Sequence, residues 1–124
     1  MSFISFTAAI ARQERYGLSG GRSTRNNNPG DIKWGEFART HGATRVEVTP
    51  PHVAPRFAYF PNPALGFEAM STLLKQHYAG LTVQQVIGKY APSCENDTDA
   101  YIHDVCEWTG LTPEIVLTDE LLAA

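Results

Sequence analysis

The stretch from residue 18 to residue 62 is interrupted by clusters of Gly, Ser, Asn and Pro, of which SGG, NNNPG and TPPHVAP are the densest. Such clusters favour turns and end regular elements, so neither a long helix nor a long strand fits here. Short strands are predicted at 31–34, 44–48 and 56–60, where FAYF brings β-favouring aromatic residues together. The middle of the chain therefore predicts a small sheet or hairpin.

Helical signals flank this irregular segment. Residues 3–16 carry apolar side chains at helical spacing, and Gly17 favours a stop. A second helical part opens at Asn62-Pro63, an N-cap followed by Pro at the first helical position. Its predicted helices run from Pro63 to Gly80, from Thr82 with a T-x-x-Q capping box through Lys89, from Asn96 or Asp97 to Gly110, and from Thr112-Pro113 to about Leu122.

These elements predict one domain over residues 1–124, of the α+β class and mainly α, with a small β/loop lobe and a helical lobe. The net charge of −3 supplies no basic field for nucleic acid, so no nucleic-acid partner is expected. Cys94 and Cys106 are too few for a disulfide framework, and their spacing matches no zinc site. No metal and no organic cofactor is expected.

The beginning of the chain, MSFISFTAAIARQE, has neither a charged leader nor a long apolar run. We therefore expect neither a signal peptide nor a membrane span. A few basic side chains gather early in the sequence, where they either meet an anionic polymer or are simply solvated. They are Arg12, Arg15, Arg22, Arg25 and Lys33.

Glu14 continues the apolar stripe of Phe6 and Ile10 into the last turn of the first predicted helix. Partial burial and the negative end of the helix dipole both disfavour a charged carboxyl there. That is the environment a general acid requires near neutral pH. The alternative, equally consistent with the spacing, is a surface ion pair with Arg12, Arg15 or Arg22.

Three consecutive amides, Asn26, Asn27 and Asn28, precede Pro29-Gly30. The turn signal explains the Pro and the Gly, but not the bunching of the amides. Amides donate and accept hydrogen bonds, so they suit sugar hydroxyl and acetamido groups, and they can also hold a catalytic carboxyl in place. Further along, Tyr90 and Tyr101 flank a loop that contains Asn96. This segment is either a plain loop with an N-cap or one side of a groove that the two tyrosines bracket.

Together these pieces resemble a family of lysozyme-like, peptidoglycan-cleaving proteins common in bacteriophages and prophages. The resemblance runs along most of the chain. It consists of IARQERYG with its Glu, the RNNNPGDI block, the aromatic FAYF segment, the GFEAMSTLL helix, and YAP followed by ENDT, Tyr101 and TGL. The RNNNPGDI block and the YAP–END pairing are its specific motifs.

The resemblance implies a lysozyme-like fold with a glycan cleft between two lobes, and it places the catalytic acid on Glu14. It assigns the 26–28 block and the Tyr90–Tyr101 region to the cleft, with Tyr59 as a further wall. Asp31 stands where Asn often follows the glycine. The identity of a second catalytic carboxylate therefore remains open: it is Asp31, Glu36 or Glu95, or the protein uses none.

The expected activity is cleavage of the β-1,4 bond between N-acetylmuramic acid and N-acetylglucosamine, favoured as a lytic transglycosylase reaction. The alternatives are a hydrolytic muramidase and a non-catalytic virion structural or glycan-binding module. We expect a monomer made in the cytoplasm that acts at the cell wall. It would be delivered there by a pore-forming holin or by a virion.

Overall fold

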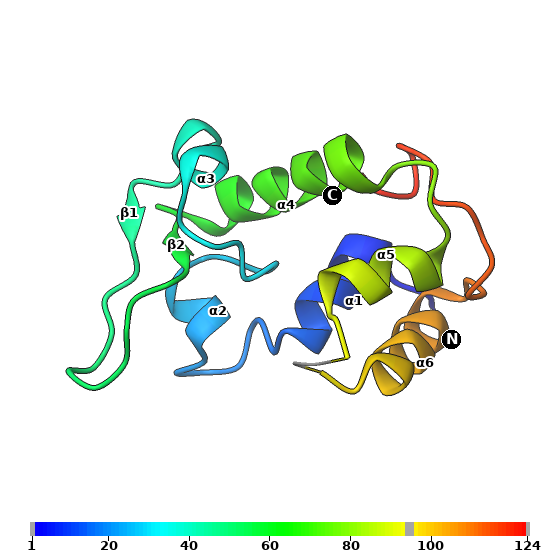
Figure 1. Cartoon of the computed structure of the whole chain (residues 1–124), viewed down its shortest axis with the longest axis horizontal. Helices are drawn as coiled ribbons and strands as arrows, with labels where there is room; N and C mark the ends of the chain where they lie inside the picture. Colours follow the sequence, from blue (N-terminus) through cyan, green and yellow to red (C-terminus); the bar gives the residue numbers. More distant parts are fainter. Residues whose placement is uncertain (1, 94–95, 124) are drawn as a thin grey trace. The chain divides into compact units, whose positions relative to one another are not determined.

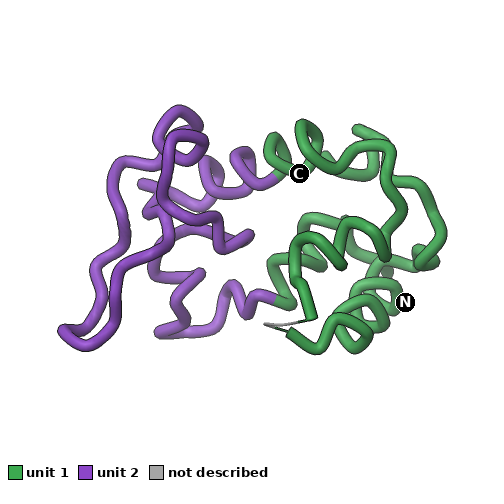
Figure 2. The backbone as a smooth tube through the Cα atoms, viewed as in Figure 1, with its two compact units in different colours: residues 1–13, 71–124 green, residues 14–70 purple. Residues whose placement is uncertain are grey.

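The computed structural model describes residues 2–93 and 96–123. The chain divides into two compact units (Figure 2): unit 1 comprises Met1–Gln13 and Ser71–Ala124, and unit 2 comprises Glu14–Met70. The described part is mainly helical with a two-stranded sheet, which confirms the α+β, mainly α class. The elements (Figure 1) are α1 (Phe6–Gln13), α2 (Arg22–Arg25), α3 (Glu36–Thr40), β1 (Arg45–Val46), β2 (Ala58–Tyr59), α4 (Pro63–Tyr78), α5 (Val83–Tyr90) and α6 (Thr98–Thr109).

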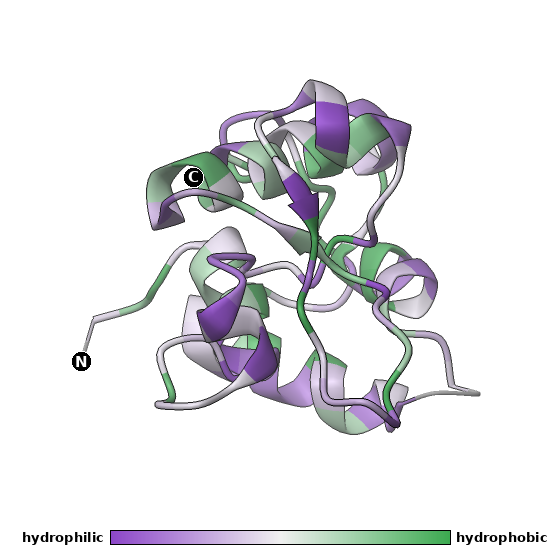
Figure 3. Ribbon diagram, turned by 90° about the vertical axis from the view of Figure 1, so that its left-hand side faces the viewer, coloured by the Kyte–Doolittle hydropathy of each residue, from purple (hydrophilic) through white to green (hydrophobic). Residues whose placement is uncertain are grey.

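Unit 1 is built around α6, which packs against α1 and α5. Helices of the protein carry both hydrophobic and hydrophilic residues (Figure 3). In α5 the buried residues Val83, Val86 and Ile87 follow helical spacing and form an apolar side. The N-terminal segment is tied to α6, because Ile4 N donates to Trp108 O over 3.0 Å. The fully buried side chains of this unit include Phe6, Ile10, Leu74, Val83, Val86, Ile87, Val105, Leu117 and Leu122.

The predicted helix ends are confirmed where the signal is local. Asn62 Oδ1 accepts the first-turn N–H at the start of α4, and Thr82 forms the capping box with Gln85 at α5. Asp97 caps α6, and Gly110 ends it with a left-handed φ of 75°. The first helix is shorter than predicted and covers Phe6–Gln13 instead of 3–16.

The predicted helix from Thr112-Pro113 to Leu122 is wrong. This segment instead runs beside the start of α5: Leu117 N donates to Leu81 O over 2.8 Å, and Val83 N donates to Ile115 O over 3.0 Å. The pairing satisfies main-chain N–H groups at the first turn of α5, which a helix leaves without intrahelical partners. It also buries Leu117 completely, so tertiary contacts override the local helical signal.

Unit 2 contains the short strands and the first half of α4. The strands β1 and β2 pair antiparallel, with Arg45 opposite Tyr59 and Val46 opposite Ala58. A separate bridge joins Lys33 to Phe57. Strands were predicted in all three of these places, and they are shorter than predicted, whereas α2 and α3 were read as loop. Among residues 2–93 and 96–123, no helix has the length and apolar character needed to cross a bilayer.

Candidate functional site

The loop formed by residues 26–31, here called the asparagine loop, is fastened to β2 and to the chain that follows it. Phe60 N donates to Asn26 O, and Asn27 Nδ2 donates to Phe60 O over 2.8 Å. Asn28 is fully buried: its Nδ2 donates to Ile32 O and Ala58 O, and its Oδ1 accepts from Ile32 N, each over 2.9 Å. The loop is therefore a fixed scaffold.

These contacts favour the turn-shaping role of the three amides over direct sugar binding. Asn26 Nδ2 donates to Glu47 Oε1 over 3.1 Å, so each of the three side chains donates within the protein. Asn27 has a positive φ of 50°, a conformation that Asn tolerates better than most residues. That the amides contact a glycan remains a prediction, and their positioning of the loop is what the geometry supports.

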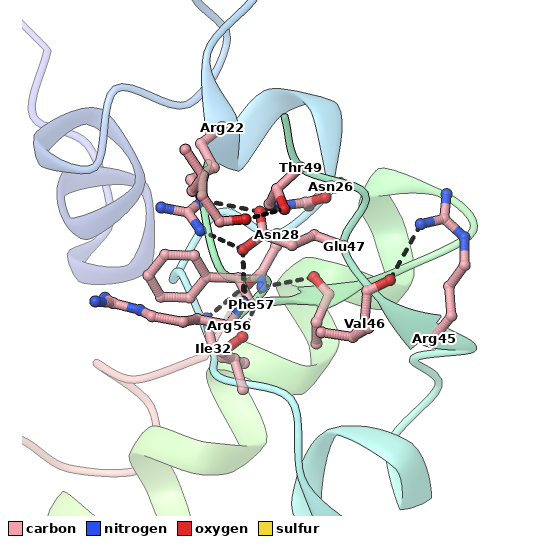
Figure 4. A network of polar contacts seen from close by, with 12 residues as sticks. Arg22, Asn26, Asn28, Ile32, Arg45, Val46, Glu47, Thr49, Arg56 and Phe57 are labelled. Carbon is pink, nitrogen blue, oxygen red and sulfur yellow. Dashed lines mark hydrogen bonds and ion pairs between the residues drawn. The ribbon is translucent and has the colours of Figure 1, made fainter. Parts of the chain in front are cut away.

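Glu47 is the centre of the polar network in unit 2 (Figure 4). Its carboxylate forms a bidentate ion pair with Arg22, whose Nε lies 2.8 Å from Oε1. Oε2 also accepts the main-chain N–H groups of Arg56 and Phe57 over 3.0 and 2.9 Å. The Glu47 side chain is 1% exposed, so a buried charge joins α2, the asparagine loop and the residues just before β2.

Burial alone would raise the pKa of Glu47. The hydrogen bonds from Arg22, from two main-chain N–H groups and from Asn26 overcome this effect and lower the pKa to about 2. Sequence reasoning missed this residue. Glu47 stands between two valines in an expected strand and its partner Arg22 lies 25 positions earlier, so no local pattern indicated the pair.

Replacing Glu47 by Gln should lower the free energy of unfolding at pH 7 by about 1–3 kcal/mol, because one amide oxygen cannot accept all of these donors. A lowered pKa stabilises the fold above the ordinary carboxyl pKa, and that stabilisation is lost as pH falls from about 4.5 toward 2. The difference in the free energy of unfolding between wild type and Glu47→Gln should thus be smaller at about pH 3 than at pH 7. Urea unfolding measures it, with exposed Glu68→Gln as the control.

Glu14 directly follows α1 and opens unit 2. Its main-chain oxygen accepts a hydrogen bond from Ser23 Oγ of α2 over 2.9 Å. Arg22, one of the ion-pair partners predicted for Glu14, binds Glu47. The side chain of Glu14 is partly exposed and forms a hydrogen bond with the side chain of Asp31.

Asp31 is therefore the carboxyl group that the structure brings to Glu14. Burial, the charge of Glu14 and the hydrogen bond with Glu14 raise the pKa of Asp31 from 3.8 to about 7, and Glu47 adds to the rise while Arg22 opposes it. Asp31 also has a positive φ of 47°. Two carboxyl groups from separate segments thus meet within one unit.

The remaining predicted residues lie elsewhere. In unit 2, Tyr59 is half-buried under the Arg45 guanidinium, 3.8 Å from its ring centroid, and Glu36 is exposed at the start of α3. In unit 1, Tyr90 is half-buried at the end of α5 and Asn96 is exposed. Tyr101 is only 2% exposed and offers a ligand little surface. Glu95 lies outside the described residues, and the glycan-binding roles all remain predictions.

Within residues 2–93 and 96–123, no group of three or more His, Cys, Asp or Glu side chains is arranged to hold a metal ion. The carboxyl groups of Glu14 and Asp31 supply acid–base chemistry in unit 2. A pair in hydrogen-bond contact, with one member of raised pKa, is suited to giving and taking a proton near neutral pH.

A comparison with known proteins found a similar protein in a bacteriophage. No protein-family profile matches the chain. The chain is similar to Protein P5 of Pseudoalteromonas phage PM2, with 32% identity over 108 residues. The alignment covers 83% of this chain but 64% of the phage protein, so the chain spans less than two thirds of that relative's length.

Proposed function

We propose that this chain is a lysozyme-like enzyme that cleaves the β-1,4 bond between N-acetylmuramic acid and N-acetylglucosamine in peptidoglycan. The observation that carries the proposal is the contact between the carboxyl groups of Glu14 and Asp31 in unit 2. Both residues are partly exposed although Asp31 Oδ1 is buried, and we propose that a substrate reaches the pair at Glu14. The pKa of Asp31 is raised to about 7, and general acid catalysis of glycosidic cleavage requires a proton that is held near neutral pH.

Glu14 is the proposed catalytic acid. It protonates the leaving oxygen while the bond from that oxygen to the anomeric carbon of the muramyl residue breaks. Its carboxylate then takes the proton of the muramyl 6-hydroxyl as that hydroxyl oxygen bonds to the anomeric carbon. The products are a free 4-hydroxyl and a 1,6-anhydromuramyl end, and no water is consumed.

The position of Asp31 supports this route over hydrolysis. A retaining glycosidase keeps its two carboxyl groups about 5 Å apart, and an inverting one about 6.5–9.5 Å apart, with the sugar or a water between them. Asp31 is hydrogen-bonded to Glu14, which is closer than either arrangement allows. A transglycosylase does not need a second carboxylate across the sugar.

The distribution of charge supports an anionic substrate. Unit 2 carries seven Arg and Lys residues against five Asp and Glu, whereas unit 1 carries three against eight. The positive balance therefore lies in the unit that holds Glu14 and Asp31. Peptidoglycan bears lactyl and stem-peptide carboxylates, which such a surface attracts.

The deciding experiment is mass spectrometry of purified peptidoglycan digested with the protein. We expect muropeptides that are one water lighter than reducing muropeptides. Fully hydrated reducing ends would overturn the transglycosylase route in favour of a hydrolytic muramidase. Intact glycan strands after prolonged incubation with folded protein would reject the enzyme and leave a non-catalytic virion structural or glycan-binding module.

The chain is similar to a phage protein, and we propose that it acts at the bacterial wall during phage entry or release. We propose that the protein reaches the wall with a virion or through a pore-forming partner. Addition of purified protein to cells with and without a permeabilised outer layer tests whether access limits its action. Equal lysis of both would contradict this dependence.

A further inference from the structure

The two carboxyl groups of unit 2 are held together by contacts that do not involve the carboxyl groups themselves. On one side, Ser23 Oγ donates to the main-chain oxygen of Glu14. On the other, Asp31 N donates to Asn28 O over 3.1 Å, and the next N–H, that of Ile32, donates to Asn28 Oδ1. The pair is thus built into the scaffold and is not a chance approach of two surface side chains.

The backbone of Asp31 carries strain that places its side chain. A φ of 47° lies in the left-handed region, which non-glycine residues seldom adopt, although Asp and Asn do so more readily than others. Strained positions persist where the surrounding structure fixes them, and they concentrate at functional sites. Here the surrounding bonds of Asn28 impose the conformation.

One oxygen of the Asp31 carboxyl lacks a hydrogen-bond donor among the described residues. Asp31 Oδ1 is buried and receives no hydrogen bond from any N–H or hydroxyl group of the described residues. Two ionised carboxylates contain acceptors only and cannot hydrogen-bond to each other. A proton on either group creates one O–H donor, which satisfies the contact and removes the repulsion between like charges.

We propose that Glu14 and Asp31 hold a single proton between them, with Asp31 as a positioning residue that keeps this proton available to Glu14 at neutral pH. The catalytic role of the shared proton rests on the proposed function, whereas the sharing of the proton between the two carboxyl groups does not depend on that function. When it passes to the leaving oxygen, both carboxyl groups are ionised in contact, and their repulsion favours return of a proton from the 6-hydroxyl.

The charged groups around the pair act in a consistent direction. Glu14 and, more weakly, Glu47 disfavour a charge on Asp31, and burial does so most strongly, whereas Arg22 favours the charge but is engaged by Glu47. The resulting rise in the pKa of Asp31 to about 7 agrees with a proton retained up to neutral pH.

The first test needs no substrate. In carboxyl-carbon NMR, wild-type protein should show a titration of the Asp31 carboxyl near pH 7. Asp31→Asn should show no carboxyl titration there. In Glu14→Gln the Asp31 titration should move to lower pH, because the charge of Glu14 is lost while burial remains, and the exposed control Glu68→Gln should behave as wild type. Asn tolerates the left-handed backbone, so Asp31→Asn should fold. A wild type without any carboxyl titration above pH 5 would overturn the shared proton.

Unfolding provides an independent measure. A carboxyl pKa raised by folding means that the folded state binds the proton more tightly than the unfolded chain, so stability falls as pH rises from about 4 to about 7. The urea midpoint of wild type should decline across this window. That of Asp31→Asn should stay level, and an equal decline in the variant would contradict the inference.

The role in catalysis is tested by the pH profile of wall cleavage. Wild-type activity should fall as pH rises through about 7, and the falling limb of Asp31→Asn should move to lower pH by about one unit or more. A variant whose activity is reduced equally at every pH would show a merely structural role and overturn the assignment. If neither protein cleaves walls while the NMR titration near 7 is present, the proposed function fails and the shared proton stands.

Discussion

Glu14→Gln should reduce peptidoglycan cleavage at least about 100-fold, because the amide has no proton to give to the leaving oxygen and cannot act as base afterwards. The change is nearly isosteric. The new amide can donate to Asp31, so the contact within unit 2 should persist and the fold should be retained. Release of soluble muropeptides from purified walls, with protein concentration set by folded fraction, measures the loss.

The matched control is Glu68→Gln, which removes the same charge from an exposed position of the same unit. It should cleave walls at the wild-type rate. If Glu14→Gln and Glu68→Gln cleave equally well while both are folded, Glu14 is not the acid. Equal loss in both would instead indicate dependence on the charge of unit 2, which added salt should then mimic.

Much of the fold could be predicted because its signals are local. The caps at Asn62, Thr82 and Asp97 and the stop at Gly110 depend on bonds within a few residues, and the structure confirms them. The two short strands and the bridge at Lys33 lie in the segments predicted from composition between turn clusters. The helix predicted after Thr112 is wrong for the opposite reason, because this segment pairs with the start of α5, which lies about 30 residues earlier in the sequence.

The candidate site was predictable only in part. The position of Glu14 after a short helix and the density of amides before Pro29-Gly30 singled out two of its pieces. Their relation to Asp31 and Glu47 depends on contacts between residues 17 to 25 positions apart, which no periodicity encodes. The amides were expected to orient a sugar or the catalytic carboxyl. Their Nδ2 groups donate to main-chain oxygens beside the loop and to Glu47, and glycan contact stays a prediction.

Gly66 is another residue whose role is invisible in sequence. It lies in the first half of α4, where glycine is ordinarily less favourable than alanine by about 1 kcal/mol. A Cβ at this position would stand 1.9 Å from the main-chain oxygen of Asn27 and 2.9 Å from Pro29 Cδ. The helix can approach the asparagine loop this closely only because position 66 has no side chain.

Gly66→Ala should therefore lower the free energy of unfolding by at least about 3 kcal/mol, because backbone must move and no flexible side-chain tip can yield. Gly88→Ala is the matched control: a Cβ there meets nothing within 4 Å, so the variant should gain up to about 1 kcal/mol from helix propensity. Urea unfolding of both variants measures the contrast. Since the displaced loop carries Asp31, any folded Gly66→Ala should also lose the carboxyl titration near pH 7. Equal stability of the two variants would mean that α4 and the loop do not meet as closely as described.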